Sequence, residues 1–491
     1  MHVAAVIFSL HAIGQLWLDF EISIAQIAIC LAVGAAMELA VVFGRERVIA
    51  WPGSGLLTAN GVAFIFRVNG TEHGDWWSTR GWGLFAACVA VSVLSKYAVV
   101  VGDRHLFNPS NIGLVVCFLL FGTGRVNPLD FWWGPWSPAL ALAYAVILVG
   151  GLTLSRRIDL LPVVAAGWVA LAAGLAVVAA SGHAMDARWH VGPVTDWSFW
   201  WVVVTSPEVL VFVFFMVTDP RTVPRGRTAQ VAFAITVGVS AALLAAPQQT
   251  EFATKVAVLA GLVVACALRP LFERAFPVPG TADDNPARWA GRHLLGLGGR
   301  GRRWAPVVTA AAVTVIGGVL VAVGSSAREP RVAAAVDVAV VAARPPVVLA
   351  ADRMPTVTVA DDARHLRSAL DQDEAERLVA DVLVDLEIER EAVRDRDLAL
   401  AATAVAGPRL DAVAADLEAG LAGTVPQRPE VLAERAEVVA VRDPTNPQAV
   451  PSIGVRLEGL EVVASGDRPM LATYAVVEVD GVHLITDEIV G

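Results

Sequence analysis

Residues 304–323 read WAPVVTAAAVTVIGGVLVAV and contain no charged side chain. About 20 consecutive apolar residues in a helix cross the hydrocarbon core of a bilayer, so this stretch predicts a transmembrane helix. Arginines at 300, 302 and 303 precede it, and acids and arginines become frequent after Ser325. The stretch therefore divides the chain into a membrane part before it and a polar domain after it.

The membrane part is predicted from a series of similar apolar runs. Of the 491 residues, 56% are hydrophobic and 17% are charged, and the charges before about residue 270 lie between apolar runs. The segment 55–67 is short and rich in glycine, which suits a broken or re-entrant helix lining a cavity. Together with 304–323, about 10–11 transmembrane helices are expected, the other candidates being 2–18, 22–43, 55–67, 81–101, 106–122, 136–154, 159–180, 198–218, 228–245 and 251–268.

Orientation is predicted from the loops, because cytoplasmic loops are enriched in arginine and lysine. Alternate loops carry the arginines, and the loops between them carry tryptophan instead. This places the N-terminus in the cytoplasm and the C-terminal domain outside, in a multi-pass protein of the cell membrane whose partner is the lipid bilayer. The predicted organisation is a membrane domain (1–270), a cytoplasmic Arg-rich connector (271–303), a final transmembrane helix (304–323), a linker (324–371) and an extracytoplasmic domain (372–491).

The outer domain is predicted to be α+β. Apolar residues recur at helical spacing over 372–402, and a second helix is expected over 408–421. Strands are expected at 434–442, 453–465, 470–479 and 482–489, with Asp480-Gly481 as a hairpin turn, and one further strand could lie in the linker. Helices followed by an antiparallel sheet resemble the cone-shaped nuclear transport factor 2-like domains, a likeness of fold that implies no chemistry. A docking or interaction domain is the expected role. His483 is expected to be exposed or hydrogen-bonded rather than catalytic.

Several classes of function find no support. A nucleic-acid partner would require a clustered basic face, and the sequence shows none. No metal site is expected, because the cysteines are isolated within apolar stretches and no Cys/His spacing accompanies them. They are Cys30, Cys88, Cys117 and Cys266. The sequence also lacks a nucleophile triad, a P-loop and a Rossmann glycine pattern.

Polar side chains inside predicted spans mark candidate sites, because such residues are expensive in a membrane and are often functional. Three segments concentrate them. The start of the helix after Pro109, with arginine and lysine nearby, is a candidate anion site, although an ordinary capped turn is the alternative. The candidate residues are Ser54, Thr58 and Asn60 in the first segment, Lys96, Arg104, Asn108, Ser110 and Asn111 in the second, and Glu208, Asp219, Arg221 and Thr222 in the third.

These segments carry a family resemblance over roughly residues 45–270. The ordered motifs are Ser-Gly-Leu-Leu-Thr at 54–58, Ser-Lys-Tyr through Phe-Asn-Pro-Ser-Asn-Ile-Gly at 95–113, and Phe-Phe-Met-Val-Thr-Asp-Pro-Arg-Thr at 214–222. They resemble the RnfD/NqrB superfamily, whose members are membrane components of the Rnf electron-transport complex and of the sodium-pumping NADH:quinone reductase. The closer likeness is to its enediyne biosynthesis protein UnbU branch.

The resemblance implies a flavin-bearing membrane protein that moves electrons through or along the bilayer. In that picture the residues of the three segments surround FMN or riboflavin or support its pocket, and redox or biosynthetic proteins are partners, some through the C-terminal domain. Relatives attach FMN to a threonine in a Ser-Gly-Ala-Thr-like motif, which this sequence lacks at 180–189. Any flavin is therefore expected to be held without a covalent bond.

Two alternatives stay open. A transporter or export helper could retain the fold without the cofactor, with Glu208 on a substrate or proton path. A membrane scaffold could instead present the outer domain to a partner.

Overall fold

The computed structural model describes two compact units. The first comprises Met1–Met185 with Thr195–Arg328, and the second comprises Asp186–Val194 with Glu329–Gly491. The residues described are 2–129, 137–185, 187, 194–296, 305–324, 338–347, 349–350, 353–360, 363, 370–421, 428–441, 452–462, 466–479 and 481–490.

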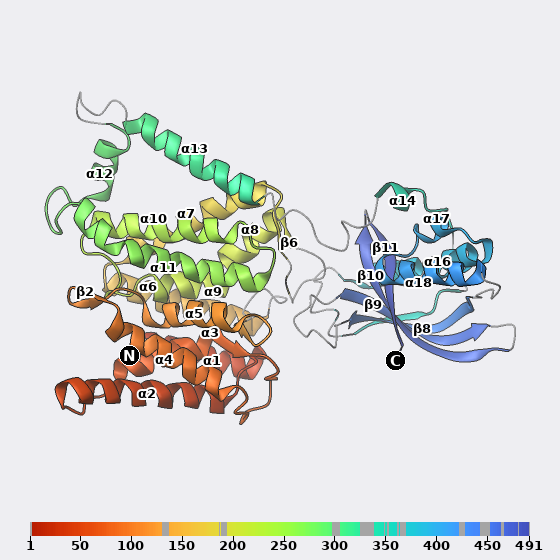
Figure 1. Ribbon diagram of the computed structural model, residues 1–491, viewed down its shortest axis with the longest axis horizontal. Coiled ribbons are helices and arrows are strands. Elements are labelled where there is room, and N and C mark those ends of the chain that lie inside the picture. Colours follow the sequence, from red (N-terminus) through yellow and green to blue (C-terminus); the bar gives the residue numbers. More distant parts are fainter. Residues whose placement is uncertain are drawn as a thin grey trace. The chain divides into compact units, whose positions relative to one another are not determined.

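The first unit is a set of helices lying side by side (Figure 1). Short paired strands interrupt them: β1 (Phe66–Val68) pairs with β4 (Val126–Pro128), and β2 (Val100–Val101) pairs with β3 (Arg104–His105). Two further short strands are β5 (Ala184–Met185) and β6 (Val194–Thr195). The helices are α1 (His2–Trp17), α2 (Ile24–Glu46), α3 (Gly53–Ile65), α4 (Trp82–Ala98), α5 (Pro109–Phe121), α6 (Pro138–Arg157), α7 (Leu161–Ala180), α8 (Asp196–Thr205), α9 (Pro207–Val211) with the π-helical turn η1 (Phe212–Met216), α10 (Arg227–Ala245), α11 (Glu251–Ala275), α12 (Pro286–His293) and α13 (Ala305–Gly324).

Within the described residues, six helices are long and apolar enough to cross a membrane: α2, α6, α7, α10, α11 and α13. The pair α8 and α9–η1 passes the same test as one span bent by 41°. Within its most apolar stretch, α2 is only 17% buried in the protein, and α13 is only 11% buried. These apolar helices therefore expose most of their surface. Apolar surface of that extent needs a lipid environment, and the chain fits a multi-pass membrane protein.

Four predicted spans are shorter helices than expected: α1, α3, α4 and α5. The segment at 55–67 is the clearest case, because α3 ends at Ile65 and the chain continues as the extended strand β1. All three residues of β1 and all three of its partner β4 are buried. Extended backbone at this depth is tolerated because the two strands satisfy each other's hydrogen bonds inside the protein.

Helix starts follow local sequence signals. Ser23 and Gln26 form a capping box at the start of α2. Asn108 and Ser206 each cap a helix through the side chain and are each followed by proline at the first helical position. Proline suits that position because its missing N–H would have no partner there.

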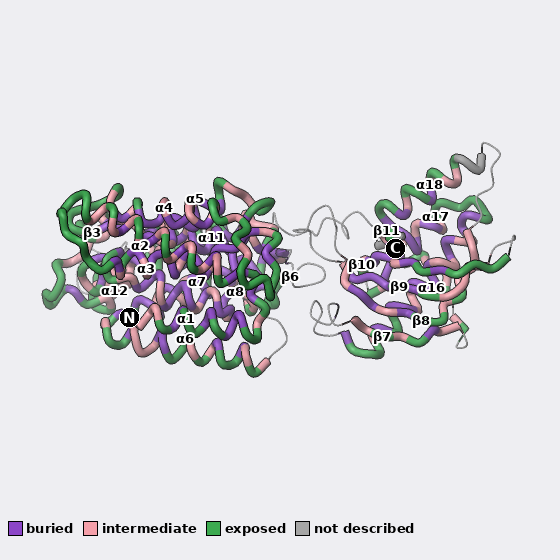
Figure 2. Tube along the Cα trace, turned by 90° about the horizontal axis from the view of Figure 1, so that it is seen from below, coloured by how far each residue is buried: buried purple, intermediate pink, exposed green. Residues whose placement is uncertain are grey.

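Small residues let the helices of the first unit approach closely. A Cβ added at Gly55 in α3 would lie 2.4 Å from the carbonyl oxygen of Gly34 in α2, and one at Gly238 in α10 would lie 2.5 Å from the backbone nitrogen of Leu171 in α7. Figure 2 shows buried and exposed residues alternating along these helices, as neighbouring faces require.

The same order of helix contacts occurs twice in the first unit. In the first half, α2 packs against α3 and α4, and α4 packs against α5. In the second half, α7 packs against α8 and α10, and α10 packs against α11. Helix α1 contacts α3, and α6 contacts α9. The short helix α3 and the bent α8–α9 segment therefore hold corresponding places in two halves.

The second unit is α+β, as predicted. Its sheet has the strand order β11-β10-β9-β8-β7, with β7 parallel to β8 and the other neighbours antiparallel. The strands are β7 (Thr356–Val359), β8 (Glu430–Val441), β9 (Ser452–Val462), β10 (Arg468–Val479) and β11 (Val482–Val490), and the helices are α14 (Val338–Ala342), α16 (Gln372–Asp395), α17 (Leu398–Ala401) and α18 (Gly407–Leu421).

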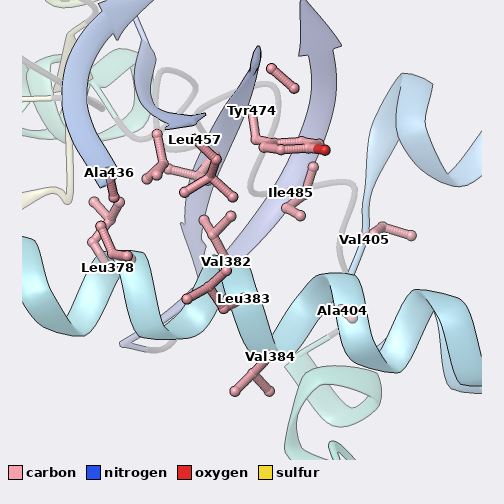
Figure 3. Close-up of a cluster of buried hydrophobic side chains, with 14 of the residues drawn as sticks. Leu378, Val382, Leu383, Val384, Ala404, Val405, Ala436, Leu457, Tyr474 and Ile485 are labelled. Atoms are coloured by element: carbon pink, nitrogen blue, oxygen red, sulfur yellow. The ribbon is translucent and has the colours of Figure 1, made fainter. Parts of the chain in front are cut away.

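The core of the second unit lies between α16 and the sheet. Leu378 and Val382 on α16 face Leu457 and Tyr474 on the sheet (Figure 3), and all four are buried. Helices and strands occur where the alternating and helical patterns predicted them, and β7 is the strand allowed for in the linker. The likeness to cone-shaped domains stays a prediction.

The hairpin predicted at Asp480-Gly481 joins β10 to β11. Val479 pairs with Val482, which leaves a two-residue connection, and Gly481 has a φ of 79°. Glycine adopts that positive φ without the strain a side chain would bring. Asp480 itself lies outside the described residues.

A buried ion pair ties the segment before β7 to this core. Arg344 Nη1 lies 2.6 Å from Asp385 Oδ1 on α16, and the Asp385 side chain is fully buried. Burial raises the pKa of the Asp385 carboxyl well above its ordinary value, and the Arg344 charge opposes that rise. Arg344 therefore stabilises the ionised form of this buried carboxyl.

We expect a fragment of residues 338–491 to be markedly more stable than one of residues 372–491. The shorter fragment lacks β7 and leaves Asp385 without Arg344, and removing one partner of a buried pair costs about 3–5 kcal/mol. Urea unfolding followed by circular dichroism measures the difference. Arg344→Met in the longer fragment isolates the contribution of the ion pair, and equal midpoints for all three proteins would contradict this account.

Candidate functional site

The first polar cluster centres on Lys96 of α4. Its Nζ donates to Glu38 Oε2 of α2 and to Ser54 Oγ of α3, both at 2.6 Å. The Lys96 and Glu38 side chains are only 6% and 12% exposed. An ammonium in such a place is stable only with a close carboxylate, so this pair joins three helices.

Asp219 lies near this pair, just after the π-helical turn η1. Its Oδ1 accepts a hydrogen bond from the backbone N–H of Arg221 at 3.0 Å, and its carbonyl accepts one from Thr222 Oγ1 at 3.1 Å. His105 Nε2 lies 3.5 Å from Asp219 Oδ2. The second motif segment therefore contacts the third, at His105 and Asp219 and again where Asn108 donates to the carbonyl of Met216.

Two arginines complete the surroundings of this cluster. Arg104 pairs with Glu273 of α11 at 2.5 Å and donates to the carbonyl of Val223 at 3.0 Å. Arg269, also on α11, donates to the carbonyls of His105 and Arg221, each at 2.9 Å. The end of α11 thus holds the two motif loops together.

The start of α5 is capped by its own side chains. Asn108 Oδ1 accepts from the backbone N–H of Asn111 at 3.2 Å and from Ser110 Oγ at 3.0 Å. Asn108 Nδ2 donates to the carbonyl of Met216 at 3.3 Å, and Asn111 Nδ2 donates to that of Leu259 at 2.9 Å. The arrangement is the capped turn, because the N–H group that an anion would use at Asn111 is already bonded.

Helix α3 carries two further candidate residues, one with its side chain hydrogen-bonded and one without a hydrogen-bond partner in the described residues. Thr58 Oγ1 donates to the carbonyl of Ser54 at 3.0 Å, a bond within its own helix. Asn60 is 1% exposed, and neither its Nδ2 nor its Oδ1 has a hydrogen-bond partner in the described part of the chain. The Oδ1 of Asn111 is also buried without a hydrogen-bond partner among these residues. Buried amide groups of this kind call for a ligand or an ordered water.

Glu208 belongs to a second cluster. Its Oε1 lies 3.1 Å from Lys255 Nζ on α11, and Lys255 also pairs with Glu251 one turn earlier. The same Nζ donates to the carbonyl of Leu129 at 2.9 Å. Lys255 and Arg269 are 14 residues apart on one helix, which corresponds to about 21 Å. The structure thus brings together Lys96, Asp219 and their neighbours, and places Glu208 elsewhere.

Sequence reasoning missed several residues of both clusters. Glu38, Glu251, Lys255, Arg269 and Glu273 all lie within α2 or α11 and are all ion-paired or hydrogen-bonded to motif residues or to one another. Their charge inside or at the end of an apolar run was the available signal. The Glu251–Lys255 spacing of four residues is a further signal, because such residues share one helix face.

In the second unit, His483 on β11 is hydrogen-bonded. Its Nδ1 lies 2.8 Å from Asp381 Oδ2 of α16, and the residue is 7% exposed. Asp381 is followed at four-residue spacing by Asp385 and Glu389, so α16 turns a carboxylate-bearing face inward. Glu389 in turn pairs with Arg409 at 3.0 Å.

Neither cluster resembles a metal centre. Within the residues that the structure describes, no group of three or more His, Cys, Asp or Glu side chains is placed to hold a metal ion. Comparison of the chain with protein-family models and with curated proteins finds no match.

We expect Glu38→Gln or Lys96→Met to destabilise the protein by about 3–5 kcal/mol, because each leaves a buried charge unpaired. The double variant should be more stable than the sum of the two losses predicts. Unfolding in mixed detergent micelles measures these free energies. The exposed pair Arg225–Asp103 is the matched control, for which about 1 kcal/mol or less is expected. Additive losses at Glu38 and Lys96 would contradict a direct coupling.

Proposed function

We propose that the protein is a membrane electron-transfer protein that binds FMN or riboflavin without a covalent bond. The observation that supports this most is that the first motif segment contacts the second, at Ser54 and Lys96, and the second contacts the third, at His105 and Asp219. These segments are far apart in the chain, and they are the ones that resemble flavin-bearing membrane proteins. The proposal extends to redox steps of natural-product biosynthesis, with a redox protein as partner.

The donor set of the first cluster fits a flavin. The Asn60 amide lies six residues after Ser54 on the same helix, is buried and has no partner in the described residues, and it would offer one donor group and one acceptor to the edge of a flavin ring. Arg221 is exposed, and within the described residues its guanidinium makes no ion pair, so it can bind a phosphate in bidentate fashion. A bound flavin would supply the capacity to accept and pass on one or two electrons.

The remaining residues of the cluster would position these groups. Asp219 fixes the backbone of the Arg221 turn through its carboxylate, and Arg269 fixes the same turn from α11. Lys96 is held by Glu38 and Ser54 and adds positive charge beside the turn. The exposed Arg221 adds a positive charge at this turn, which favours an anionic cofactor over a neutral one.

The absorbance spectrum of the purified protein tests the proposal. Flavin absorbance should be present after gentle purification in detergent, or after reconstitution with FMN or riboflavin. Arg221→Gln should weaken FMN binding by about tenfold, since a charged hydrogen bond contributes about 1.5 kcal/mol or more, and should leave riboflavin binding unchanged. Arg227→Gln, which alters an exposed arginine paired with Asp159, is the control. No flavin in either preparation would overturn the proposal.

A second candidate function is transport without a cofactor, and the cluster around Glu208 favours it. Glu208 lies at the break between α8 and α9, and broken helices with buried charges commonly surround transport sites. In this alternative the carboxylate of Glu208 would carry a proton.

Proteoliposomes with a pH-sensitive dye inside test this alternative. Under an imposed potassium diffusion potential, wild-type protein should admit protons, and Glu208→Gln should lower the flux at least about tenfold because the amide cannot titrate. Glu46→Gln, at an exposed position near the end of α2, is the control. Flux equal to that of empty liposomes would exclude the transport role.

A further inference from the structure

A cavity lies beside the second cluster, where three interrupted parts of the first unit meet. Its walls come from the end of α3, from the segment at the end of β4, from the break between α8 and α9, and from α11. Part of this space is open to the outside, so a small molecule can reach the lining residues. Most of the lining is apolar, including Phe64, Leu129, Phe212 and Val258.

Thr254 gives this cavity an unsatisfied polar group. It is fully buried, it lines the cavity, and its hydroxyl has no hydrogen-bond partner in the described part of the chain. Two other threonines of the first unit behave differently. Thr218 and Thr236 each donate to the carbonyl four residues earlier, the usual solution for a threonine inside a helix. A buried hydroxyl without a partner costs about 1–3 kcal/mol, so a ligand group that bonds it gains that difference.

The charges beside the cavity are already matched. Lys255 uses its three donors on Glu208, Glu251 and the Leu129 carbonyl. Arg67 is buried, and its charge acts most on Glu21 and next on Glu208, so both cations here have carboxylate partners. A charged ligand would disturb this balance in an apolar setting, whereas a neutral one would not.

We propose that this cavity binds a neutral, largely apolar molecule that carries one hydroxyl group, an alcohol or a phenol. The ligand oxygen accepts the Thr254 hydroxyl hydrogen, and the ligand hydroxyl donates to the carboxylate of Glu208, the acid that lines the same cavity. Such a molecule could come from the bilayer, as a lipid alcohol, or from the water, as a small aromatic alcohol. This site is independent of the proposed flavin site.

Equilibrium dialysis of wild-type protein in lipid nanodiscs against radiolabelled 1-naphthol and naphthalene tests the proposal, with empty nanodiscs as the partition blank. Wild-type protein should bind 1-naphthol at least about fivefold more tightly than naphthalene, the effect of about one hydrogen bond. Thr254→Val, which keeps the side-chain shape, should abolish that preference and leave naphthalene binding unchanged. Thr236→Val, outside the cavity lining, should retain it. Equal binding of the two probes by wild-type protein would overturn the proposal.

A second variant tests the cavity itself. Val258→Trp fills the space from α11 and should lower the binding of both probes at least about tenfold, whereas Val149→Trp, on the exposed side of α6, should not. Binding that survives Val258→Trp would place the probe elsewhere and overturn the assignment. Mass spectrometry of organic extracts distinguishes the two sources of the ligand. A lipid alcohol that co-purifies with wild-type protein but not with Val258→Trp would show that the ligand comes from the bilayer. If no such alcohol co-purifies and 1-naphthol still binds, the ligand comes from the water.

Discussion

The high free-energy cost of a charged group in an apolar membrane interior governs the arrangement of the first unit. Both lysines of the chain are buried there, and each one joins separate segments through its donors. Lys96 holds the start of α3 through Ser54 and α2 through Glu38. Lys255 holds the start of α9 through Glu208 and the segment after β4 through Leu129. Since α3 and α8–α9 occupy corresponding places in the two halves, each interrupted helix is fixed by one buried ammonium.

Interrupted helices are stable here because their free backbone groups find partners inside the protein. The end of α3 passes into β1, which pairs with β4, and the N–H of Leu129 donates to the carbonyl of Ile65 at 2.6 Å. The hydroxyl of Ser206 caps α9 at the bend. These local solutions leave room between the interrupted segments, and that room is the cavity beside Thr254.

The sequence predicted what depends on local pattern and missed what depends on distant pairing. Long apolar runs predicted α2, α7 and α11, and alternating residues predicted β8 to β11. Hydropathy could not show that the segment at 55–67 leaves the helix at Ile65, because the strand that β1 pairs with lies about sixty residues later. Likewise Glu208 was predicted as a candidate residue inside a span, but its partner Lys255 was not, since nothing local to either residue reports the other.

The two clusters differ in ways that assign them different chemistry. The first has an exposed guanidinium at Arg221 that makes no ion pair within the described residues, as the proposed charged cofactor would require. The second is enclosed by aliphatic and aromatic side chains, and its ionised groups already neutralise one another. A ligand that fits one setting would therefore be poorly solvated in the other. Because α11 carries residues of both, about 21 Å apart by helix rise, the same helix supports a polar cluster and an apolar-lined cavity without merging them.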